Sequence, residues 1–76
     1  MNAYEASLGM IRNAKKIYEE EKAIKDRLRI SFLMTNGKEH TGTSIKEQDG
    51  AWILQSGSEK VLLNPMAISS VKMIDN

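Results

Sequence analysis

The sequence predicts an α+β fold that is mostly β, with an N-terminal helix followed by a bent, five-stranded antiparallel open barrel. Three observations carry this prediction. The spacing of apolar residues changes from three or four to two near residue 27. Asn36-Gly37 joins two extended runs, which is the strongest short-range signal for a β-hairpin. Gly42 interrupts the second run, as expected where a strand bends or another backbone comes close. We therefore expect an amphipathic helix over 1–27 and the barrel over 28–76, in a single domain.

Residues 3 to about 26 are expected to form one helix. Asn2 is a suitable N-cap, and Glu5 follows three residues later, close to the capping-box pattern. Apolar residues recur at spacings of three and four, and we interpret them as a single stripe that packs on the chain's own sheet. A coiled coil is the less favoured alternative, because the heptad pattern is short. The stripe consists of Leu8, Met10, Ile11, Ala14, Ile17, Tyr18, Ile24 and Leu28.

Five strands are expected after the helix. Apolar residues at every second position over 28–34 predict a first strand with one buried face, and Asn36-Gly37 predicts a type I′ turn after it. The second strand runs from 38 to about 45 through Gly42, and turns at 48–50 and 56–58 separate it from the next two. Pro65 ends the fourth strand, because proline has no N–H to donate to a ladder. The last three strands are placed at 51–55, 61–63 and 68–74.

The composition excludes several classes of protein. The chain has 76 residues, 41% of them hydrophobic and 28% charged, which is typical of a folded soluble domain. No apolar run approaches the ~20 residues of a membrane span, and the N-terminal residues do not resemble a secretory signal, so we expect a cytoplasmic protein without membrane contact. The chain has no cysteine and one histidine, His40, so neither a disulfide nor a structural metal site is expected.

No catalytic motif is present. His40 has no serine or aspartate partner in a recognisable pattern, and a phosphate-binding loop of the GxxxxGK type is absent. We expect a protein that is not an enzyme and has no cofactor.

A domain this small needs additional stabilisation, and without disulfide or metal the expected source is self-association. A short, curved sheet leaves open edges at the fourth and fifth strands, where a second copy can pair. The expected interface residues are Val61, Leu62, Leu63, Val71 and Met73.

The basic residues are unevenly distributed. The net charge is only +1, yet residues 1–29 hold seven of the eleven Lys and Arg residues against five acids. A solvated helix face explains this pattern, and so does contact with phosphates. Three other residues also have two interpretations. Trp52 is a core residue or stacks on a base, and the core is favoured. His40 is a surface residue on the solvent face or a base contact. Asn64 closes a turn or lines a pore.

From Ile30 onwards the chain resembles the Sm-like family, and within it the bacterial Hfq branch. The Asn36-Gly37 turn is followed five residues later by Gly42, as in the first motif of that family, and Ile45 and Asp49 follow at nearly the family spacing. The apolar stretch Trp52-Ile53-Leu54 and the closing Ala67-Ile68-Ser69-Ser70-Val71 complete the resemblance, which covers about residues 28–74.

The resemblance implies a helix on a strongly bent five-stranded sheet, assembled into rings of six or seven subunits that bind RNA. In Hfq a lysine-histidine pair before the closing strand contacts uridine; here Pro65 and Met66 occupy those positions. Our first hypothesis is a homo-oligomeric RNA-binding ring, and the second is an Sm-fold interaction module that has lost the uridine pocket and docks a partner through its long helix. A ring that binds a small nucleotide between subunits is a third possibility, which no motif supports. The candidate RNA contacts are Arg12, Lys15, Lys16, Arg27, Arg29, His40, Trp52 and Asn64.

Overall fold

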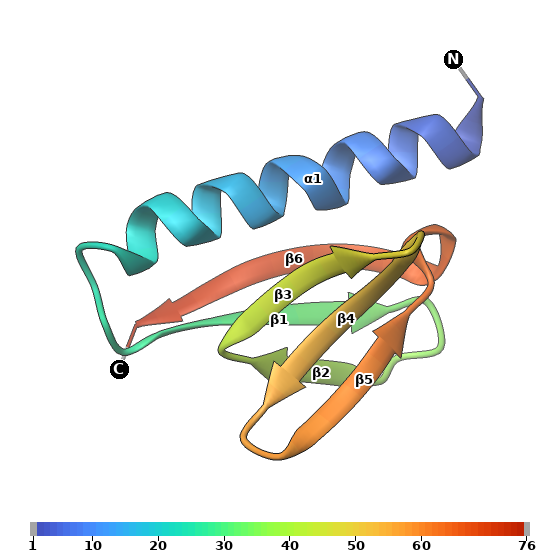
Figure 1. Ribbon diagram of the computed structural model, residues 1–76. Coiled ribbons are helices and arrows are strands. Elements are labelled where there is room, and N and C mark those ends of the chain that lie inside the picture. Colours follow the sequence, from blue (N-terminus) through green and yellow to red (C-terminus); the bar gives the residue numbers. More distant parts are fainter. Residues whose placement is uncertain (1, 76) are drawn as a thin grey trace.

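The structure, a computed structural model, describes residues 2–75 and consists of an N-terminal helix and two antiparallel three-stranded sheets (Figure 1). The helix α1 packs against η1, β1 and β6. The expected α+β class with mostly β-structure is therefore confirmed. The elements are α1 (Ala3–Lys22), β1 (Leu28–Met34), β2 (Glu39–Gly42), β3 (Ser44–Gln48), β4 (Ala51–Ser56), β5 (Glu59–Leu63), η1 (Pro65–Ala67) and β6 (Ile68–Asp75).

The helix begins where the sequence predicts and ends earlier. The Asn2 side chain accepts a hydrogen bond from the Glu5 N–H at 2.8 Å, so Asn2 is the N-cap. The helix stops at Lys22 rather than near 26, because the chain turns there to enter β1. In this turn the Leu28 N–H donates to the Lys25 carbonyl at 3.1 Å.

The single apolar stripe expected on α1 is wrong. Ile11, Ala14 and Tyr18 are buried, whereas Met10 and Ile17 are exposed on a different side of the helix. Consecutive helical residues point about 100° apart, so Met10 cannot share the direction of Ile11. Ile24, in the turn after the helix, is 84% exposed.

The predicted second strand belongs to both sheets. Thr43 divides it into β2, which pairs with β1, and β3, which pairs with β4. The strand orders are β2-β1-β6 and β3-β4-β5, so the described residues form six strands rather than five, and no closed barrel. Gly42 stands at the division because a Cβ there would lie 2.6 Å from the Gln55 carbonyl oxygen. The close approach of another backbone thus explains this glycine.

The hairpin at Asn36-Gly37 is present, but its turn is not type I′. Only Gly37 has a positive φ there, +88°, and the Met34 N–H bonds the Lys38 carbonyl across a longer loop. Positive φ at both central residues occurs instead at Asp49-Gly50, which joins β3 and β4 through the Gln48–Ala51 pair. The turn with positive φ at both central residues thus joins β3 to β4 rather than β1 to β2.

The core lies between α1 and the concave sides of the two sheets. Tyr18 is central to it: its hydroxyl lies 2.8 Å from both the Leu28 and the Thr43 carbonyl oxygens. Lys22 Nζ donates to the Thr43 carbonyl at 2.6 Å. These contacts fasten the helix to the start of β1 and to the point where the chain passes between sheets. The buried core comprises Ile11, Ala14, Tyr18, Leu28, Ile30, Phe32, Met34, Ile45, Trp52, Leu54, Leu63 and Ile68.

The described part of the chain contains no helix that is long and apolar enough to cross a membrane. Residues 2–75 also hold no group of three or more His, Cys, Asp or Glu side chains that could coordinate a metal ion.

Candidate nucleic-acid interface

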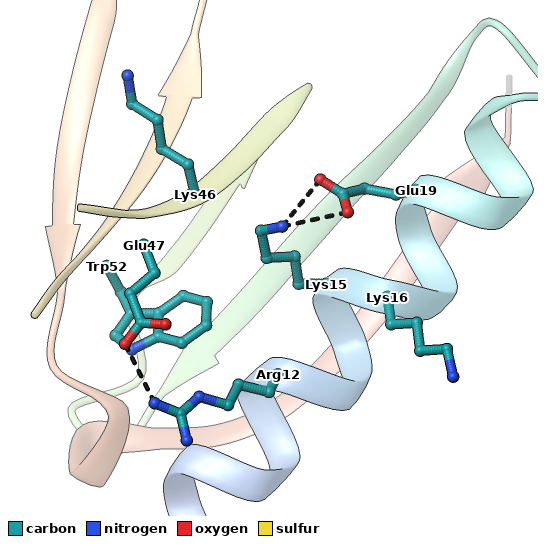
Figure 2. A pocket seen from close by; sticks show the side chains of 7 residues that line it. All are labelled: Arg12, Lys15, Lys16, Glu19, Lys46, Glu47 and Trp52. Atoms are coloured by element: carbon teal, nitrogen blue, oxygen red, sulfur yellow. Dashed lines mark hydrogen bonds and ion pairs between the residues drawn. The ribbon is translucent and has the colours of Figure 1, made fainter.

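The basic residues of α1 line a groove between the helix and the β3–β4 hairpin. This α1–β3 groove has a volume of about 440 Å³ and is open to solvent. Figure 2 shows that α1 forms one wall and β3 the other, with the Trp52 indole between them. The lining residues are Arg12, Lys15, Lys16 and Glu19 of α1, Lys46 and Glu47 of β3, and Trp52 of β4.

Two ion pairs occupy the groove. Arg12 Nη2 donates to Glu47 Oε2 at 3.2 Å and so connects the two walls, and Lys15 Nζ donates to Glu19 at 3.1 Å along the helix (Figure 2). Both pairs are partly solvated, and exposed pairs of this kind contribute about 0–1 kcal/mol. They position the side chains without contributing much to the stability of the fold.

Lys16 and Lys46 give the groove its excess positive charge. The lining contains four cations and two carboxylates, a net charge of +2. Arg12 and Lys15 neutralise the two carboxylates, while no ion pair among residues 2–75 involves Lys16 or Lys46. In Figure 2 both lysine side chains extend away from the Trp52 indole, Lys46 beyond the β3 wall and Lys16 from the side of α1 that faces away from β3.

Trp52 belongs to the core, as favoured from the sequence. It is only 2% exposed, so its ring face is not available for stacking on a base. Its indole Nε1–H is buried and has no hydrogen-bond partner. A buried donor without an acceptor lowers the stability of the fold by about 1–3 kcal/mol. The indole nitrogen is therefore a polar atom of the groove whose hydrogen-bonding capacity is unused.

The remaining candidate RNA contacts do not gather at the groove. Arg27 is exposed in the turn before β1, and Arg29 is half-buried within β1 opposite Ile74. The expectation of a solvent-facing His40 is wrong: it pairs with the core residue Phe32, lies on the same side of the sheet, and is half-buried. The Asn64 side chain accepts the Met66 N–H at 3.0 Å, which is the turn-closing interpretation.

The expected interface strands each have one open edge. β5 pairs only with β4, and β6 pairs only with β1, so their outer backbone groups have no partner strand. Leu62 on β5 is 73% exposed. The Leu63 side chain is buried in the core and is therefore not accessible to a neighbouring subunit. Val61, Val71 and Met73 are half-buried and pack against the core.

Sequence reasoning missed Glu47 as the partner of Arg12 and Lys46 as a residue that lines the groove. Lys46 and Ile45 lie on opposite faces of β3, as alternation along a strand requires. The contact of Glu47 with Arg12, by contrast, depends on the division at Thr43. No local signal in the sequence specifies that division beyond Gly42.

Comparisons with protein-family models, with curated proteins and with solved structures found no match.

Proposed function

We propose that this chain is an Sm-like, cytoplasmic subunit that assembles into a homo-oligomeric ring, a hexamer or heptamer, and binds RNA through its basic helix. The observation that carries the proposal is that β5 and β6 are edge strands, each at one end of its own sheet. In this proposal the two sheets are the halves of an open Sm-type barrel.

The open edges favour assembly because backbone N–H and C=O groups without a ladder partner readily pair with another chain. β5 of one subunit and β6 of the next can supply the two edges of a continuous sheet. Leu62, exposed on β5, adds apolar surface that such an interface would cover. Repetition around a ring then pairs the β5 and β6 edges of every subunit.

RNA is the proposed ligand because a ring repeats the charge of α1 around its axis. Arg12, Lys15 and Lys16 lie on or beside one side of the helix, and their field adds over all copies. Pro65 and Met66 cannot donate side-chain hydrogen bonds to a base, so the contacts are assigned to the helix rather than to a uridine pocket.

Two measurements on one sample test the proposal. Native mass determination should give a multiple of 8.5 kDa, and labelled uridine-rich or adenine-rich RNA should bind with an affinity that falls steeply as salt rises. The double variant Lys15→Gln, Lys16→Gln should weaken binding, whereas Lys38→Gln, exposed in the turn between β1 and β2, is the control. A monomeric mass would contradict the ring, and no RNA binding at low salt would contradict the ligand.

A second function, an Sm-fold module that docks a protein through α1, is favoured by a specific observation. Met10 and Ile17 are exposed on α1 seven residues apart, which is the spacing of an apolar seam on a helix, and Ile24 is exposed in the turn that follows α1. Binding through this seam would persist at salt concentrations that abolish phosphate contacts. Retention of a partner at high salt, lost in Ile17→Lys, would favour this function over RNA binding.

A further inference from the structure

We propose that the α1–β3 groove is a binding site for a small phosphate monoester that carries hydroxyl groups, of the chemical class of a nucleoside monophosphate. The groove lies within one chain, so this site requires neither a ring nor RNA and goes beyond the function proposed above.

The groove has the size and charge for such a ligand. Its volume of about 440 Å³ lies within the ~300–1,000 Å³ of small-molecule sites. The net lining charge of +2 matches a phosphate monoester, which carries about −1.5 to −2 at neutral pH. Lys16 and Lys46 supply this excess, because Arg12 and Lys15 already offset the two carboxylates.

The indole of Trp52 supplies the observation that points to a bound oxygen. Its Nε1–H is a donor only, it is buried at the base of the groove, and it has no acceptor among the described residues. The Arg12 and Glu47 side chains that cross the groove are 56% and 35% exposed, so they can rotate to admit a ligand. A phosphate oxygen at this position would accept from the indole and from the guanidinium together.

The carboxylates select an ester over inorganic phosphate. Ionised Glu19 and Glu47 only accept hydrogen bonds, and they repel the phosphate oxygens of an ester and of inorganic phosphate alike. A ribose-like diol beside the phosphate would donate to them instead. The same groove thus offers donors at one position and acceptors at another, as a hydroxylated ester requires.

Trp52 is the only tryptophan, so one indole N–H resonance reports on the site. We would titrate ¹⁵N-labelled protein with adenosine or uridine monophosphate, with inorganic phosphate and with a short oligonucleotide, at an ionic strength kept constant with chloride. The expected result is a saturable shift of the indole N–H resonance with the monophosphates, and a weaker response to inorganic phosphate. A shift only with the oligonucleotide, or one that follows ionic strength alone, would overturn the proposal.

Variants locate the ligand. Lys16→Gln and Lys46→Gln should each weaken binding by about twofold, the effect of one solvated charge at about twice contact distance, while Lys60→Gln should not change it. Trp52→Phe, checked for folding by circular dichroism, should weaken binding roughly tenfold through the lost donor. If all three groove variants bind the monophosphate with the affinity of the native chain, the proposed site is wrong, even if the indole resonance of the native chain shifts. The native mass and RNA binding are measured separately, so failure of the ring or of RNA binding leaves this result interpretable.

Discussion

At the scale of single residues, the hydroxyl of Tyr18 links three segments of the chain. It lies 2.8 Å from the carbonyl oxygens of Leu28 and Thr43 and also accepts from Lys22 Nζ at 3.1 Å. A phenol has one proton, so it donates to one carbonyl at a time, and the lysine serves the Thr43 carbonyl as well.

Replacing Tyr18 with Phe removes only this hydroxyl and leaves a buried carbonyl without its donor. We expect the free energy of unfolding to fall by about 1–3 kcal/mol, measured by urea denaturation. Tyr4→Phe is the matched control: Tyr4 is half-exposed, and its variant should stay within about 0.5 kcal/mol of the native chain. Equal stability of both variants would show that the Tyr18 hydroxyl contributes nothing.

Two glycines should respond in opposite directions to the same substitution. Gly42→Ala places a methyl group 2.6 Å from the Gln55 carbonyl oxygen and 2.7 Å from Leu54 Cδ1, so we expect a loss of about 1–3 kcal/mol. Gly9→Ala, on α1 with nothing within 4 Å of the new Cβ, should gain roughly 0.5–1 kcal/mol from helix propensity. In thermal melts, the midpoint temperature of Gly42→Ala should lie below that of the native chain and that of Gly9→Ala above it. A Gly42→Ala variant of unchanged stability would contradict the close approach.

At the scale of elements, α1 has one buried and one exposed apolar side. Replacing an isoleucine with alanine on each side should change the free energy of unfolding by different amounts. Ile11→Ala should lower the free energy of unfolding by about 2–5 kcal/mol, because Ile11 is fully buried. Ile17→Ala should change it by no more than about 0.5 kcal/mol, because Ile17 is half-exposed. Similar losses for both variants would mean that a second surface covers Ile17.

The elements themselves were largely predictable from the sequence. Asn2 as the helix cap, alternation in β1 and Pro65 at the end of β5 are local signals, and the structure follows each of them. The length of α1, the division at Thr43 and the turn type at Asn36-Gly37 are not local. They depend on which strand each residue meets, and a single sequence contains that information only indirectly.

At the scale of the whole molecule, the open edge of β5 predicts how assembly can be blocked without unfolding the chain. Leu62→Lys places a charge on an exposed position of an edge strand, a change that disfavours edge-to-edge pairing. If the chain assembles as proposed, this variant should be an 8.5 kDa monomer with an unchanged circular dichroism spectrum.

Leu33→Lys is the control for this variant. Leu33 is also exposed, but it lies on β1, which is paired on both sides. Dissociation by Leu33→Lys to the same extent would place the interface elsewhere.

The candidate site shows the same limit of sequence reasoning. Arg12, Lys15 and Lys16 were predictable as a basic cluster, since their spacing fixes them near one side of a helix. The opposite wall of the groove, Lys46 and Glu47, comes from a strand 30 or more positions away, and the orphaned Trp52 donor exists only because the core closes around it. Long-range packing, rather than any motif, creates the groove.

The double contact of Tyr18 also has a consequence for how the molecule opens. The helix cannot separate from the β-structure without releasing both the start of β1 and the Thr43 junction, so detachment of α1 and parting of the two sheets should be one event. Native-state hydrogen exchange would then report a common opening free energy for amides in β1 and in β4. In Tyr18→Phe the two sets should diverge, because the β3–β4–β5 sheet could then open before the other.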